Sequence, residues 1–121
     1  MSNTTKTVLI VEDERPLSHA LELKLQHEGF DVTVASNGRE CLELVEDKHF
    51  DIVLLDLIMP EVDGFQVLEQ LKQKDDAPAV FVLSNLSQRE DEERVLALGA
   101  HKFFIKSDTS LTTIVEEVKQ V

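Results

Sequence analysis

The stretch Ile52-Val53-Leu54-Leu55-Asp56 decides the fold class of this chain. Its four consecutive apolar residues do not alternate with polar ones, which is typical of a strand buried on both faces of a parallel sheet. Similar apolar runs recur at residues 8–11, 32–35, 79–83 and 103–105, and four of the five runs are nearly continuous. The sequence therefore predicts a five-stranded parallel sheet.

Segments with a helical spacing of apolar residues follow each of these runs. The first carries Leu17, Leu21 and Leu25, with Pro16 near its first turn and Gly29 after its end, which are common start and stop signals. Crossovers between parallel strands are right-handed and place helices on both faces of the sheet. The pattern predicts one doubly wound (βα)5 α/β domain over residues 1–121.

Side chains at the predicted helix ends support this alternation. Asn37 is placed to cap the second helix, with Glu40 reaching back, and residues 87–90 form a capping box before the fourth. Apolar positions of the third and fifth helices lie at 64–71 and 111–118.

The composition excludes several classes of protein. The net charge of -12 argues against nucleic acid or an anionic membrane as a direct partner, because both require a basic surface. No apolar stretch approaches the roughly 20 residues needed to span a bilayer, and residues 1–6 do not resemble a signal peptide. A single cysteine, Cys41, cannot form an internal disulfide and fits a reducing compartment. We expect a cytoplasmic domain.

Polar side chains follow four of the five predicted strands. Glu12 and Asp13 come after the first, Asp56 ends the third, Ser84 the fourth and Lys106 the fifth. Ligands of doubly wound folds bind beyond the carboxyl ends of the strands, so we expect these groups to lie together. Each group alone has a simpler explanation as a cap, a turn or a surface charge. Their joint placement favours a site.

This set of residues predicts chemistry with phosphate. Three crowded carboxylates repel one another unless a cation compensates, and Mg²⁺ or Mn²⁺ prefers oxygen ligands. The Lys106 ammonium and the Ser84 hydroxyl suit phosphoryl oxygens. The arrangement is suited to forming and breaking an aspartyl phosphate, with Asp56 as nucleophile.

Over its whole length the chain resembles the response regulator receiver domains of two-component signalling. Segments 8–14, 36–40, 56–64 and 99–106 carry this resemblance, and 56–64 is the most specific. The resemblance implies a flavodoxin-like sheet with strand order 2-1-3-4-5. It also implies the following roles: Asp56 as phosphoacceptor, Glu12, Asp13, Asp56 and the backbone carbonyl of Ile58 as metal ligands, Lys106 and Ser84 as contacts of the phosphoryl group, and Phe103 as an aromatic switch.

Three departures from the family pattern concern geometry and kinetics. Ser107 follows the lysine where a proline is usual, so we expect a trans Lys106–Ser107 peptide. Ile58 and Leu86 occupy positions beside the phosphate that are often polar, and Asn85 is larger than usual. We expect the two apolar residues to slow hydrolysis of the phosphate.

The implied function is a phosphorylation-gated switch rather than an enzyme acting on other molecules. Its phosphodonor would be a sensor histidine kinase or a histidine phosphotransfer protein. A downstream protein or a second copy would dock on the face of the fourth helix, fifth strand and fifth helix. One alternative is an aspartyl-phosphate phosphohydrolase, which usually needs an acid or base near the nucleophile, a role that Ile58 cannot serve. The other is a degenerate receiver that only binds partners.

Overall fold

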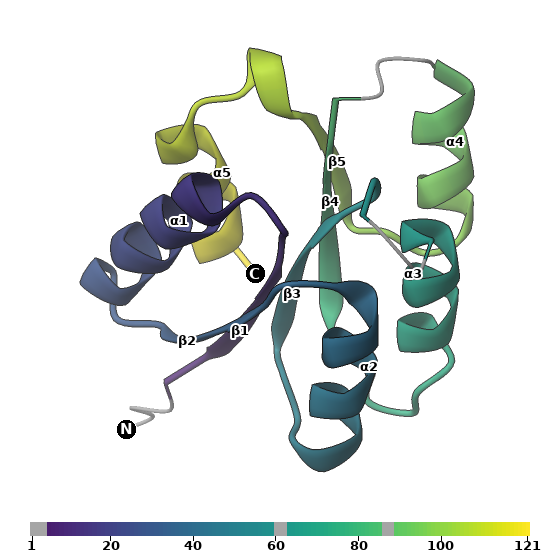
Figure 1. The fold of residues 1–121 in the computed structure, drawn as a ribbon, viewed down its shortest axis with the longest axis horizontal. Helices are drawn as coiled ribbons and strands as arrows, with labels where there is room; N and C mark the ends of the chain where they lie inside the picture. Colours follow the sequence, from purple (N-terminus) through teal and green to yellow (C-terminus); the bar gives the residue numbers. More distant parts are fainter. Residues whose placement is uncertain (1–4, 60–62, 86–88) are drawn as a thin grey trace.

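A computed structural model describes residues 5–59, 63–85 and 89–121. The chain forms one parallel sheet in the order β2-β1-β3-β4-β5, with a helix after each strand (Figure 1). The strands are β1 (Thr7–Val11), β2 (Asp31–Ala35), β3 (Ile52–Asp56), β4 (Ala79–Ser84) and β5 (Lys102–Ile105). The helices are α1 (Arg15–His27), α2 (Gly38–Asp47), α3 (Gly64–Lys72), α4 (Arg89–Ala97) and α5 (Leu111–Lys119), and a short 3₁₀ helix, η1 (Lys106–Asp108), precedes α5. The predicted doubly wound fold and its strand order are confirmed.

The sheet separates two hydrophobic cores. Helices α1 and α5 cover one face, and α2, α3 and α4 cover the other (Figure 1). In β1, Val8 and Ile10 pack toward α1 and α5, whereas Leu9 and Val11 pack toward the opposite helices. This alternation follows from the two-residue period of a strand and explains why the central strands are apolar throughout.

The expectation of burial on both faces is wrong for β5. Among its four residues only Phe104 is buried, while Lys102 is exposed and Phe103 and Ile105 are partly exposed. The strand lies at the edge of the sheet, where it pairs with β4 alone. An edge strand has a neighbour on one side only, so its side chains are covered less completely than those of β1 or β3.

Several of the helix ends follow the predicted pattern. The Asn37 side chain accepts a hydrogen bond from the Glu40 N–H at 2.8 Å, and the Glu40 carboxylate accepts one from the Ser36 N–H at 2.9 Å. Gly29 and Gly99, after α1 and α4, have φ angles of +97° and +106°, a conformation that favours glycine. The capping box expected at 87–90 lies partly outside the described residues.

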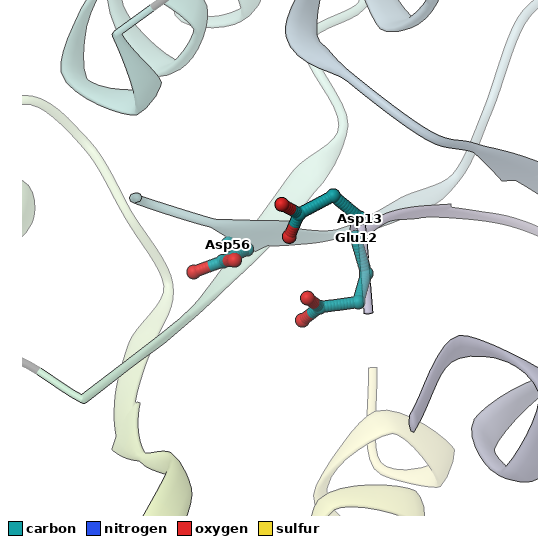
Figure 2. Close-up of side chains that lie close together, drawn as sticks. All are labelled: Glu12, Asp13 and Asp56. Atoms are coloured by element: carbon teal, nitrogen blue, oxygen red, sulfur yellow. The ribbon is translucent and has the colours of Figure 1, made fainter. Parts of the chain in front are cut away.

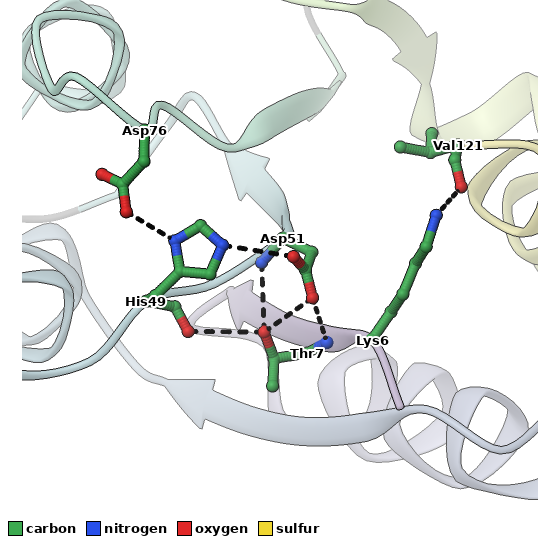
Figure 3. A network of polar contacts seen from close by, with 6 residues as sticks. All are labelled: Lys6, Thr7, His49, Asp51, Asp76 and Val121. Atoms are coloured by element: carbon green, nitrogen blue, oxygen red, sulfur yellow. Dashed lines mark hydrogen bonds and ion pairs between the residues drawn. The ribbon is translucent and has the colours of Figure 1, made fainter. Parts of the chain in front are cut away.

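A polar network ties the loops at the amino edge of the sheet (Figure 3). The Asp51 carboxylate accepts hydrogen bonds from the Thr7 N–H at 2.9 Å and from the Thr7 hydroxyl at 3.2 Å. The two ring nitrogens of His49 face Asp51 at 3.2 Å and Asp76 at 2.8 Å. Lys6 bonds the carbonyl of Val121 nearby. This end of the molecule is opposite the carboxyl edge.

None of the described helices is both long and apolar enough to cross a membrane.

Candidate functional site

The predicted acidic residues meet at the carboxyl edge of the sheet. One carboxylate oxygen from each of Glu12, Asp13 and Asp56 lies within 4.8 Å of the others, and Figure 2 shows the three side chains together. No other cluster of this kind occurs among the described residues. Glu12 and Asp56 are only 1% and 3% exposed, whereas Asp13 is exposed. Two carboxylates are thus buried in the protein and the third faces solvent.

Backbone hydrogen bonds hold the two buried carboxylates in place. The Ile58 N–H donates to Asp56 Oδ1 at 3.2 Å, directly after the end of β3. The Glu14 N–H donates to Glu12 Oε2 at 3.1 Å, at the start of α1. Each carboxylate is therefore fixed by the first turn of the loop that follows its strand.

The Lys106 ammonium contacts three carboxylates at once. Its Nζ lies 2.8 Å from Glu12 Oε1, 3.1 Å from Glu14 Oε2 and 3.2 Å from Asp56 Oδ2. The side chain of Lys106 is only 11% exposed.

Lys106 is the first residue of η1, directly after β5. No peptide bond of the described residues is cis, so the Lys106–Ser107 bond is trans, as predicted. Ser110 then caps α5 by accepting a hydrogen bond from the Thr113 N–H.

The burial of these charges changes how readily they ionise. The pKa of Glu12 is raised to about 7, chiefly by desolvation and in addition by the charge of Asp56, while Lys106 opposes the rise. Desolvation likewise raises the pKa of Asp56, against the effect of Lys106. Burial alone would lower the pKa of Lys106, but its contacts with Glu12 and Glu14 leave it raised. A protein-derived cation therefore partly neutralises the buried acids.

A divalent cation fits this donor set. All three clustered groups offer oxygen, the ligand atom that Mg²⁺ prefers. Glu12 Oε1 is buried and makes no hydrogen bond among the described residues, although it is paired with Lys106, so it has a free lone pair for a metal. The exposure of Asp13 gives the cluster a side open to water, which Mg²⁺ usually retains.

The remaining predicted residues differ in their relation to the acid cluster. Ser84 is fully buried at the end of β4, which lies beside β3. Ile58 is 56% exposed immediately beyond Asp56 and Leu57. Phe103 is partly buried in the core beneath α4, paired in register with Val82. Leu86 lies outside the described residues, so the structure does not place it.

Sequence reasoning did not identify Glu14 as part of the site. Its carboxylate contacts Lys106, from which it is separated by 92 positions in the chain. A third acid after Glu12 and Asp13 is, from sequence, an ordinary residue at the start of a helix. The contact between Glu14 and Lys106 arises because the residues that follow β1 lie beside those that follow β5 in the folded protein.

The family model, the curated relatives and the solved structures that match this chain all point to the same family. Residues 8–119 match the model of the response regulator receiver domain. A probable transcriptional regulator, ycf27 of Porphyridium aerugineum, is 35% identical over 99 residues, which cover 82% of this chain and 41% of that protein. The chain thus spans less than half the length of the curated relatives it matches.

Two solved structures extend the comparison to the fold. The receiver domain of the Francisella response regulator 1452 has a TM-score of 0.89 and 27% identity, covering 96% of this chain and 95% of its own. The response regulator TrrA of Thermotoga maritima, solved in complex with Mg(2+)-BeF, has a TM-score of 0.83 and 28% identity, covering 96% and 98%. With the fold, the acid cluster and the family match in agreement, this chain belongs to the response regulator receiver domain family.

Proposed function

We propose that this receiver domain is a switch that takes a phosphoryl group onto Asp56. The observation that carries the proposal is the position of Asp56 Oδ2. It lies 3.2 Å from the Lys106 ammonium, and its carboxylate belongs to the cluster with Glu12 and Asp13. A nucleophile, a fixed cation and further oxygen ligands are the components that phosphoryl transfer requires.

The proposed reaction exchanges one bond to phosphorus for another. An Asp56 carboxylate oxygen attacks the phosphorus of a phosphohistidine, the new O–P bond forms, and the P–N bond breaks with its electron pair returning to the imidazole. Lys106 faces the oxygens of the transferred group and Ser84 supplies a hydroxyl to them. Water later attacks the same phosphorus, which releases inorganic phosphate and restores the carboxylate.

Glu12, Asp13, Asp56 and the Ile58 carbonyl would hold the metal ion. When bound, Mg²⁺ supplies positive charge that offsets the charge of the transferring phosphoryl oxygens. The response regulator TrrA was solved in complex with Mg(2+)-BeF, which supports the binding of Mg²⁺ here. The raised pKa of Glu12 also supports it, because crowded buried carboxylates favour a compensating cation.

The partners follow from the chemistry and the family. The donor is a sensor histidine kinase or histidine phosphotransfer protein, and the output is contact with a protein target or a second copy through α4, β5 and α5. Leu96 of α4 is 44% exposed on this part of the molecule, which supports a docking role. The alternative of a phosphohydrolase gains no support, since Ile58 offers no acid or base.

Acetyl phosphate distinguishes the alternatives. After incubation with Mg²⁺, the intact mass of a switch should rise by one phosphoryl group, and chelation of the metal should prevent the rise. Rapid consumption of acetyl phosphate without a lasting adduct would instead indicate a phosphohydrolase. Neither adduct nor consumption would indicate a domain that only binds partners and would refute the proposal.

A further inference from the structure

The Glu14 side chain contacts the site without belonging to the acid cluster. We propose that Glu14 is a positioning residue that holds Lys106 in the unphosphorylated protein and competes with the phosphoryl group for it. The inference rests on the proposed role of Asp56 as phosphoacceptor. It assigns to Glu14 a part in setting how strongly the site holds a phosphoryl group.

The hydrogen-bonding capacity of Lys106 is the first reason. An ammonium group has three N–H donors and accepts no hydrogen bond. Three carboxylates already surround this ammonium: Glu14 Oε2 accepts a hydrogen bond from it at 3.1 Å, and Glu12 and Asp56 each place an oxygen within 3.2 Å of Nζ as ion pairs. A phosphoryl group on Asp56 would bring further oxygens beside this ammonium, and they would compete with Glu12 and Glu14 for its donors.

Differences in burial indicate which partner leaves. The side chain of Glu12 is 0% exposed, whereas that of Glu14 is 58% exposed. A buried carboxylate that loses its cation pays a large desolvation cost, but an exposed one is solvated by water at once. Glu14 is thus the partner whose release costs least.

The backbone keeps Glu14 within reach of Lys106. Its N–H donates to Glu12 Oε2 at 3.1 Å, and its carbonyl accepts hydrogen bonds from the Leu17 and Ser18 N–H groups in the first turn of α1. Glu14 occupies the N-cap position of α1, yet its side chain makes no capping hydrogen bond. The carboxylate is therefore directed to Lys106 rather than to the helix that it precedes.

Two substitutions of Glu14 separate the effect of its contact with Lys106 from the effect of its negative charge near the site. Glu14→Gln removes the charge and nearly keeps the size. Glu14→Asp keeps the charge, but its side chain is one methylene shorter, so its carboxylate should no longer reach the Lys106 ammonium. Glu43→Gln, an exposed position on α2, removes the same charge elsewhere.

The experiment measures the affinity for beryllofluoride by ¹⁹F NMR titration at saturating Mg²⁺. Both Glu14 variants should bind it more tightly than wild type, by about twofold to fivefold, the scale of one exposed ion pair. Glu43→Gln should match wild type. Wild-type affinity in Glu14→Asp, or in both Glu14 variants, would overturn the competition and leave the role of Asp56 intact. Failure of the wild type to bind beryllofluoride, with no adduct from acetyl phosphate, would refute both proposals.

Discussion

Gly64 donates its backbone N–H to the Leu57 carbonyl at 3.2 Å, and its Cα lies against the Leu57 backbone with no room for a side chain. A Cβ at position 64 would lie 2.5 Å from the Leu57 Cα and 2.6 Å from its carbonyl oxygen. The first residue of α3 therefore packs against the residue that directly follows β3. This contact fixes Leu57, which lies between Asp56 and Ile58.

Replacement of Gly64 by alanine should therefore destabilise the protein and disturb the site. We expect a loss of about 2 to 4 kcal/mol in the free energy of unfolding, from overpacking and a lost hydrogen bond. Urea denaturation measures it. Gly29→Ala is the matched control, because no atom beyond the two adjacent residues lies within 4 Å of its added methyl group. Only the positive φ is unfavourable there, which costs about 1 kcal/mol. Equal losses in the two variants would contradict the crowding at Leu57.

Ionised Asp51 should stabilise the fold at neutral pH. The pKa of this carboxyl is lowered chiefly by the hydrogen bond from the Thr7 N–H, burial opposes this effect, and His49 lowers the pKa further. A lowered pKa means that the stabilisation is present above the ordinary value of 3.8 and is lost as pH falls through the lower value of the folded protein. Asp51→Asn should cost about 1 kcal/mol at neutral pH, discounted for partial exposure, and progressively less in acid.

Unfolding of wild type and Asp51→Asn in urea at about pH 7 and about pH 3 tests this dependence. Asp76→Asn serves as the control, since Asp76 is 63% exposed and contacts His49 without touching Thr7. Its cost at neutral pH should be below about 1 kcal/mol. A deficit of Asp51→Asn that stays constant between the two pH values would show that ionisation of Asp51 is not responsible.

The apolar side chain of Ile58 should prolong the life of the aspartyl phosphate. Hydrolysis needs a water aligned with phosphorus, and a hydrocarbon at this position offers no hydrogen bond to hold one. Ile58→Asn should shorten the lifetime by about threefold or more, still below the ~10²-fold that a true acid-base group contributes. Ile58→Val, which stays apolar, should match wild type. The double variant with Leu86→Glu should lose phosphate fastest, and unchanged or slower hydrolysis there would refute the shielding.

Phosphorylation should be sensed at Phe103. Ser84 ends β4 and pairs in register with Ile105, which lies two residues beyond Phe103 in β5. If Ser84 moves toward the phosphoryl group, the surroundings of the Phe103 ring should therefore change. We expect chemical-shift changes in the Phe103 ring when the protein is phosphorylated. Phe30, packed in the opposite core, should shift little. Changes confined to residues around Asp56 would contradict the coupling.

Most of the fold could be predicted from the sequence because the strands of the sheet are nearly continuous apolar runs. The runs in β1, β3 and β4 are buried on both faces, so their composition alone identifies them. Burial of β5 could not be predicted in the same way, because its apolar residues resemble those of a central strand. Whether a strand lies at an edge depends on which strands pair, and the run of residues does not encode that.

The candidate site was predictable in its members but not in its contacts. Parallel strands bring their carboxyl ends to one edge, so Glu12, Asp56 and Lys106 could be grouped from sequence. The contact of Glu14 with Lys106 depends on side-chain reach between two loops, and no local pattern reports it. The need for glycine at position 64 likewise arises from the return of the chain to Leu57.

The most direct test of the proposed switch identifies the residue that carries the phosphoryl group. Borohydride reduces an aspartyl phosphate to homoserine, which marks the modified position permanently for peptide mass spectrometry. After treatment with acetyl phosphate and Mg²⁺, we expect homoserine at position 56 alone, and none in Asp56→Asn or after chelation of the metal. Homoserine at position 13, or an unchanged Asp56 in a protein that nevertheless gains a phosphoryl group, would contradict the assignment.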